Sequence, residues 1–134
     1  MWETVPRLLA DNRYLVLGTA DTEGRPWVTP VFFAADGGHK VFWVSSVDSR
    51  HSHNISARPT VAITIFDSHV PVGGAEAVYL EATAGPVSGH AVAEGVDLLN
   101  TRLSASDRLG PENIAPAGPM QVYQATITHH FVLI

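Results

Sequence analysis

The chain has no cysteine, which excludes disulfide bonds, thiolate metal sites and a cysteine nucleophile. An excess of positive charge is also missing: the formal net charge is -5 at pH 7 and the pI is about 5.7. Such a chain is not expected to bind nucleic acid or an anionic membrane, and any phosphate site on it must be a local cluster of donors. No stretch approaches the ~18 apolar residues that a membrane span needs. The segment from Met1 to Pro6 lacks the basic start and apolar run of a signal peptide, so a cytoplasmic protein is expected.

The composition is that of one globular domain. The chain has 134 residues, of which 46% are hydrophobic and 16% charged, enough for a genuine core and too few residues for two ordinary domains. We therefore predict a single domain over residues 1–134.

Alternating apolar residues and turn signals predict a mostly β protein. We expect strands over residues 14–20, 26–35, 40–45, 60–66, 76–87 and 120–134, with the first three forming an antiparallel meander. Short helices are expected over residues 3–12, from Ser49 to just before Pro59, and over residues 91–103. Residues 104–119 carry three prolines and two glycines and read as an irregular loop. This pattern favours a small antiparallel β-barrel with short helices.

The segment that carries recognisable chemistry runs from residue 41 to residue 58. A strand ends in Ser45-Ser46, and a helix begins at Ser49-Arg50-His51. Hydroxyl groups, the free N–H groups of a helix start and a guanidinium together make a good anion site. The same residues are equally consistent with an ordinary capped turn followed by a solvated arginine.

The order of motifs along the chain resembles the pyridoxamine 5'-phosphate oxidase-like, FMN-binding split-barrel family. The resemblance covers roughly residues 8–87 and rests on five segments. Residues 24–33 are similar to the family's Gly-x-Pro-x-x-x-Pro strand, and residues 41–51 match a strand followed by Ser or Thr, three variable residues and Ser-Arg-Lys. The other three segments are Gly18-Thr19-Ala20, Asn54-Ile55 with residues 58–62, and residues 78–84. The resemblance implies an antiparallel split β-barrel of the FMN-binding type.

The resemblance also implies which residues bind the cofactor. The phosphate and ribityl chain would be held at Ser45, Ser46, Ser49, Arg50 and His51, and the isoalloxazine ring would lie along Val28, Thr29, Pro30 and Val31, mostly through backbone groups. His51 stands where the family usually has lysine, and Ala77 falls near a glutamine that often contacts the ring. Basic residues expected on the second strand are missing, which argues against an oxidase that produces pyridoxal phosphate.

The function expected from this resemblance is an FMN-dependent oxidoreductase that works on a small-molecule substrate. Two alternatives are a deazaflavin-dependent reductase on the same fold and a non-catalytic flavin- or haem-binding protein. Aromatic-rich strands in so short a barrel predict a homodimer, with Trp27 and Trp43 the side chains most expected to touch cofactor or partner. We predict no metal site, since His51 and His53 are two residues apart and do not share a helix face.

Overall fold

The computed structural model describes residues 3–133. Three residues of the predicted domain lie outside the described residues: Met1 and Trp2 of the N-terminal segment, and Ile134 of the predicted last strand. The helices are α1 (Thr4–Asp11), α2 (Arg50–Ala57) and α3 (His90–Asn100), with a 3-10 turn at Ala105–Asp107. The strands are β1 (Tyr14–Ala20), β2 (Pro26–Phe32), β3 (Ala34–Asp36), β4 (Lys40–Ser46), β5 (Thr60–Phe66), β6 (Ala77–Pro86) and β7 (Met120–Val132).

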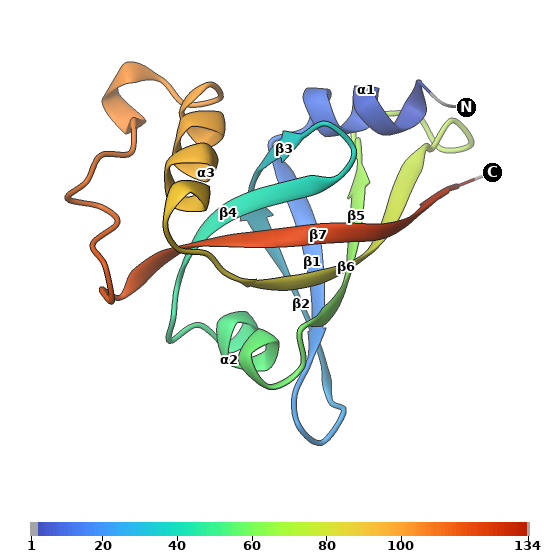
Figure 1. The fold of residues 1–134 in the computed structure, drawn as a ribbon. Coiled ribbons are helices and arrows are strands. Elements are labelled where there is room, and N and C mark those ends of the chain that lie inside the picture. Colours follow the sequence, from blue (N-terminus) through green and yellow to red (C-terminus); the bar gives the residue numbers. More distant parts are fainter. Residues whose placement is uncertain (1–2, 134) are drawn as a thin grey trace.

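The strands form one antiparallel, seven-stranded sheet in the order β2-β1-β5-β6-β7-β4-β3. Its two edge strands, β2 and β3, follow each other in the chain with only Phe33 between them. The sheet must therefore curl until its edges approach, and Figure 1 shows the resulting half-barrel, with α1 and β3 at one end and α2 at the other. This confirms the predicted split β-barrel.

The predicted three-strand meander is wrong, because the expected strand over residues 26–35 is broken at Phe33. The Phe33 N–H donates to the Arg13 carbonyl oxygen at 3.1 Å, and the Phe33 carbonyl accepts from Arg102 Nη1 at 2.7 Å. Both backbone groups are thus taken by partners outside β4. The chain before Phe33 stays paired with β1, and the chain after it pairs with β4.

The core fills the inside of the barrel and includes Trp43, whose side chain is fully buried and stacked on Tyr123, with ring centroids 6.0 Å apart. The expectation that Trp43 touches cofactor or partner is therefore wrong. Phe42, on the opposite face of β4, is buried as well, because α3 packs there (Figure 1). With both faces covered, β4 shows no alternation that could separate core from surface.

Helix α3 ends at Asn100, three residues before the predicted end. The Asn100 side chain turns the chain there: its amide donates to the Leu109 carbonyl at 3.1 Å, and its oxygen accepts from the Leu109 N–H at 2.8 Å. No helix within residues 3–133 is long and apolar enough to cross a membrane.

Replacing Gly95 with alanine is expected to destabilise the fold by about 1–3 kcal/mol, the usual cost of overpacking a core. A Cβ at this buried position of α3 would lie 2.8 Å from Val122 Cγ1 and 2.9 Å from Phe42 Cδ1, and this outweighs the ~1 kcal/mol gain in helix propensity. Thermal unfolding measures the effect. Gly85→Ala is the matched control, because a Cβ there meets nothing within 4 Å; equal melting temperatures for the two variants would contradict the prediction.

Candidate functional site

The turn between β4 and α2 is built from serine hydroxyls. Ser49 caps the helix by accepting from the Ser52 N–H at 3.3 Å. The Ser52 hydroxyl donates to the Ser46 carbonyl at 2.7 Å and lies 2.7 Å from the Ser49 hydroxyl. The Ser46 hydroxyl accepts from the Asp48 N–H at 3.1 Å. The capped turn predicted from sequence is therefore present, and it fixes where the first residues of α2 point.

His51 lies between the two serines predicted to bind with it. Its Nε2 is 2.8 Å from Ser45 Oγ and 3.3 Å from Ser49 Oγ. Burial lowers the pKa of His51 below its usual value, so the ring is neutral near pH 7. In this state His51 contributes hydrogen-bonding capacity to the cluster and no charge.

Arg50 supplies the positive charge of this region. Its side chain is exposed, and its guanidinium carbon lies 4.2 Å from the centre of the Trp27 ring. Such a contact is worth about 0.5–1 kcal/mol at an exposed site, and it leaves the N–H edges of the guanidinium uncovered. Within residues 3–133 no carboxylate forms an ion pair with Arg50, so it is available for an external anion.

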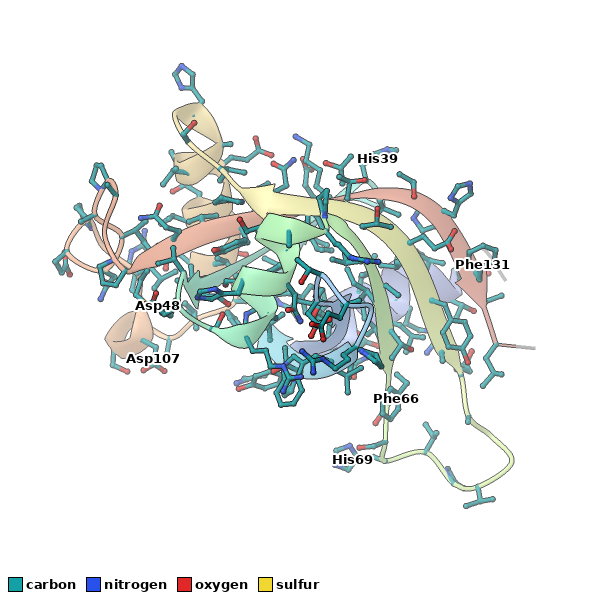
Figure 2. The ribbon with its side chains drawn as sticks, turned by 90° about the horizontal axis from the view of Figure 1, so that it is seen from below. His39, Asp48, Phe66, His69, Asp107 and Phe131 are labelled. Atoms are coloured by element: carbon teal, nitrogen blue, oxygen red, sulfur yellow. The ribbon has the colours of Figure 1, made fainter. Side chains whose placement is uncertain are left out.

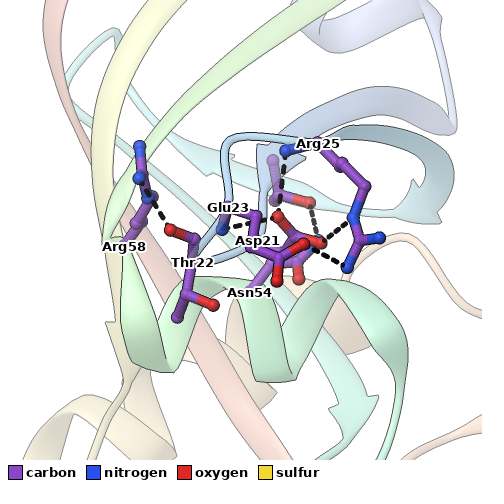
Figure 3. Close-up of polar contacts among 7 residues, drawn as sticks. Asp21, Thr22, Glu23, Arg25, Asn54 and Arg58 are labelled. Atoms are coloured by element: carbon purple, nitrogen blue, oxygen red, sulfur yellow. Dashed lines mark hydrogen bonds and ion pairs between the residues drawn. The ribbon is translucent and has the colours of Figure 1, made fainter.

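Helix α2 is anchored to the β1–β2 hairpin by two long-range hydrogen bonds (Figure 3). The buried Asn54 amide donates to Thr19 Oγ1 at 3.0 Å, and Arg58 Nη2 donates to the Thr22 carbonyl at 3.1 Å. Sequence reasoning missed this anchor. A signal was present, since Thr19 continues the inward-facing series of β1 after Leu15 and Leu17.

The hairpin itself is fixed by a charged turn. Arg25 Nε lies 2.9 Å from Asp21 Oδ2, and Arg25 Nη2 lies 2.9 Å from Glu23 Oε2. The hydrogen bonds from Arg25 lower the pKa of Asp21 to about 2. Figure 3 shows this turn beside α2. The charged network therefore fixes the conformation of the hairpin turn that contacts the helix.

Strand β2 presents its residues in two directions. Val28 and Pro30 face outward and are exposed, whereas the Val31 side chain is buried in the core and Thr29 is half-buried. In the described part of the chain β2 pairs only with β1, so alternate peptide groups along its free edge are unpaired. Any contact of Val31 with a ligand must use its backbone. The geometry joins Arg50 to β2 through Trp27, the residue before Val28.

A protein-family model, Pyridoxamine 5'-phosphate oxidase, matches residues 1–132 of this chain. The chain belongs to this family. No curated protein matches.

Solved structures of other proteins share the fold of this chain. HutZ, a haem storage protein from Vibrio cholerae, has a TM-score of 0.80 and 17% identity, covering 97% of this chain and 92% of its own. A FAD-binding protein from Mesorhizobium loti has a TM-score of 0.73 and 16% identity, with coverages of 98% and 93%. An F420 reductase has a TM-score of 0.62 and 24% identity, with coverages of 93% and 94%. Identities this low show a shared fold, and the bound groups named belong to those proteins.

Within the pyridoxamine 5'-phosphate oxidase family, this member has few basic residues near the turn that are free to bind an anion. Arg25 is paired with two carboxylates, and Arg58 is engaged with the hairpin. Lys40 lies at the far end of β4, 3.5 Å from Glu94. Ala77, where a glutamine often contacts the ring in the family's oxidase, is buried. Among the described basic residues near the turn, Arg50 is thus the one without a protein partner for its charge.

Large apolar side chains are exposed on the outer face of the barrel, beside the Glu81 carboxylate and His129, which lie 3.3 Å apart on the same face. Tyr79 lies opposite Phe131 on neighbouring strands and is followed across the sheet by exposed side chains of β1, β2 and β5. Figure 2 shows Phe66 and Phe131 projecting from the barrel on the strands that form this face. The outer apolar face consists of Tyr14, Val28, Phe66, Tyr79 and Phe131, which are 41–66% exposed. Exposed apolar patches on proteins are common at interaction sites.

Proposed function

We propose that this protein binds FMN and acts as a flavin-dependent oxidoreductase on a small-molecule substrate. The observation that carries the proposal is the unpaired Arg50 guanidinium on Trp27, at the start of a helix whose next residue, His51, contacts the hydroxyls of Ser45 and Ser49. A phosphate monoester fits this set, because a guanidinium can bind it through two parallel hydrogen bonds while hydroxyls and the N–H groups at the start of α2 complete its shell.

The chain's own residues would position the cofactor. Arg50, Ser45, Ser49 and His51 would hold the phosphate, with Ser46 shaping the turn, and the exposed edge of β2 from Val28 to Val31 would hydrogen-bond the ring through peptide groups. FMN, when bound, supplies the hydride or electron transfer chemistry. The proposal needs no acid–base dyad from the protein.

Among the described residues near the turn, Arg50 is the single cation without a partner, which favours FMN over a deazaflavin cofactor with a longer acidic tail. Such a tail would need further basic side chains, and Arg25, Arg58 and Lys40 are already engaged. The F420 reductase among the similar structures keeps the deazaflavin as the second candidate. Side-by-side titration with both cofactors separates the two, since tighter binding of the deazaflavin would reverse the order.

We also propose that the outer apolar face pairs with a second copy of the chain. The exposed aromatics on β5, β6 and β7 would be covered by the same face of the partner in a two-fold arrangement. The face includes Val28 on the strand proposed to bind the flavin ring, so the cofactor would lie next to the interface.

The first test is an absorbance spectrum of the purified protein before and after addition of FMN. We expect the visible bands of the flavin to shift and to saturate at one FMN per chain. Riboflavin, which lacks the phosphate, should bind at least ~10-fold more weakly, the equivalent of one charge-assisted hydrogen bond. Equal binding of the two flavins would contradict the phosphate site, and no binding of either would contradict the function.

Turnover is tested separately on the loaded protein with nicotinamide donors and a panel of acceptors. Reduction of the bound flavin and its reoxidation by an acceptor are expected of an oxidoreductase. A flavin that binds and is never reduced would favour a non-catalytic flavin-binding protein, and haem binding in place of flavin would favour the haem alternative.

We also propose that the protein is located in the cytoplasm, because nicotinamide donors are supplied there. Fractionation of its cells can test this location.

FMN affinity is expected to increase as the pH falls from about 8 to about 6. In the free protein burial lowers the pKa of His51, whereas a bound phosphate dianion would raise it, so binding takes up a proton and is favoured at low pH. We expect Kd to fall several-fold over this range. His51→Gln is the control, because it keeps the titration of the phosphate itself; the same pH profile in both proteins would show that His51 takes no part.

A further inference from the structure

A cavity lies at the opposite end of the barrel from the proposed flavin site. It has a volume of about 670 Å³, is open to solvent, and is lined by α1, β3 and the β3–β4 turn, the end of α3 with the two residues after it, and one residue of β7. In Figure 1, α1 and β3 lie at one end of the barrel and α2 at the other. The seven residues of β4 separate the two regions, a distance of roughly 20 Å at ~3.3 Å per residue. Ligands bound in the two regions would therefore not be in direct contact.

The walls of the cavity are mainly apolar and are formed by α1, β3 and α3. Its volume lies within the ~300–1,000 Å³ range of small-molecule sites. The apolar lining residues are Val5, Pro6, Leu9, Ala10, Ala34, Ala35 and Leu98. Such walls suit a hydrocarbon chain or ring.

The one arginine and two histidines come with no acidic residue among the described lining residues. Arg102, His39 and His130 line the cavity together with Thr101, Gly37 and Gly38. This is a local reversal in a chain whose formal net charge is -5. The cavity therefore selects against cations and favours an anionic group.

Arg102 is a half-buried cation without a counter-ion. Its guanidinium donates to the carbonyl oxygens of Phe33 at 2.7 Å and Ala10 at 3.3 Å, and also to that of Asn12. It forms no ion pair with a carboxylate in residues 3–133. Three neutral acceptors use at most three of the five guanidinium N–H groups, so capacity remains for an anion.

The floor of the cavity is fixed before any ligand arrives. His130 Nε2 donates to the Gly38 carbonyl at 2.7 Å and holds the β3–β4 turn against β7. Arg102 likewise holds the end of α1 and Phe33 in place. A site that is already ordered costs little conformational entropy on binding. His39, in contrast, is exposed at the rim with its ring free of protein partners in the described chain.

We propose that this cavity binds an apolar monocarboxylic acid, with its hydrocarbon part against the walls from α1 and α3 and its carboxylate at Arg102 and His39. The proposal concerns a site apart from the flavin site and does not rest on flavin binding.

The test is isothermal titration of the flavin-free protein with decanoate, using decanol as the neutral analogue of equal chain length. We expect saturable binding of one decanoate per chain and at least tenfold weaker binding of decanol. Arg102 is left unchanged, because it also anchors Phe33. His39→Ala tests the rim side chain instead: it removes a hydrogen-bond partner of the carboxylate and is expected to weaken decanoate binding several-fold, more than it weakens decanol binding.

A second variant tests the location. Ala10→Trp places an indole in the cavity from the exposed side of α1 and should weaken decanoate binding at least tenfold. The matched control is Ala75→Trp in the exposed loop before β6, which should bind like the unmodified protein. FMN titration of Ala10→Trp reports on the flavin site independently and should be unchanged.

Three results would overturn the proposal. Absence of saturable decanoate binding would show that the cavity takes no such ligand, and equal binding of decanol would remove the role of the basic residues. Unchanged binding in Ala10→Trp would place decanoate elsewhere, for example on the outer apolar face. None of these results bears on FMN binding, so failure here is distinguishable from failure of the proposed function.

Discussion

Replacing Arg50 with alanine is expected to weaken FMN binding by about 10- to 100-fold, the loss of one or two charge-assisted hydrogen bonds to the phosphate. The reason is the local charge balance: Arg50 is the unpaired cation at the turn, and His51 is neutral because burial lowers its pKa. No other basic side chain described near the turn is free to replace it. Titration followed by flavin absorbance measures the change.

Two comparisons make this result specific. Riboflavin affinity should hardly change in Arg50→Ala, because riboflavin has no phosphate for the guanidinium to bind. Arg108→Ala, in the exposed loop after α3, removes the same charge elsewhere and should leave FMN affinity as it was. An equal loss for both flavins would mean that Arg50 acts through the packing of Trp27 and not through the phosphate.

Replacing Tyr79 with glutamate is expected to raise the dissociation constant of the proposed dimer at least about 100-fold. Tyr79 lies near the middle of the outer apolar face, opposite Phe131 on β7 and Thr64 on β5. A two-fold interface would bury the introduced carboxylate twice, once from each copy, and an unpaired buried charge costs several kcal/mol. Sedimentation velocity over a range of protein concentrations measures the effect.

The control for this variant is Val72→Glu. Val72 is fully exposed in the loop between β5 and β6 and lies off the sheet face, so the same apolar-to-acidic change there should not alter the mass in solution. Both substitutions are at exposed positions, and both chains should remain folded by circular dichroism. A monomeric mass for the unmodified protein at micromolar concentration would contradict the dimer itself.

Local sequence rules were sufficient for much of the helix and strand pattern. Ser49 provides an acceptor for a free N–H of α2, and Pro59 prevents helical conformation in the residue before it, so both ends of this helix follow from neighbouring residues. In β5 the buried positions Val61, Ile63 and Ile65 alternate with more exposed ones. Such features depend on interactions within a few residues and can be recognised without the fold.

The family resemblance predicted the candidate cofactor site, which local sequence rules do not predict. The serine, arginine and histidine of the turn are individually common, and only their order relative to the preceding strands led us to propose a phosphate site in addition to the capped turn. The structure brings Ser45, Ser49 and His51 within hydrogen-bonding distance. It also supplies Trp27 as the support for Arg50, a contact between two segments whose proximity their separate patterns did not predict.

Sequence alone thus determined the element types, the capped turn and, by resemblance, the barrel and the nine residues proposed to bind FMN. Tertiary structure decided the rest. The break at Phe33 depends on Arg13 and Arg102 as backbone partners, the burial of Phe42 depends on α3 covering the outer face of β4, and the anchor of α2 joins Asn54 to Thr19 across 35 residues. The basic cavity under α1 arises in the same way. Each of these features depends on contacts between segments that are distant in the sequence. Those segments meet because the whole sheet curls into the half-barrel.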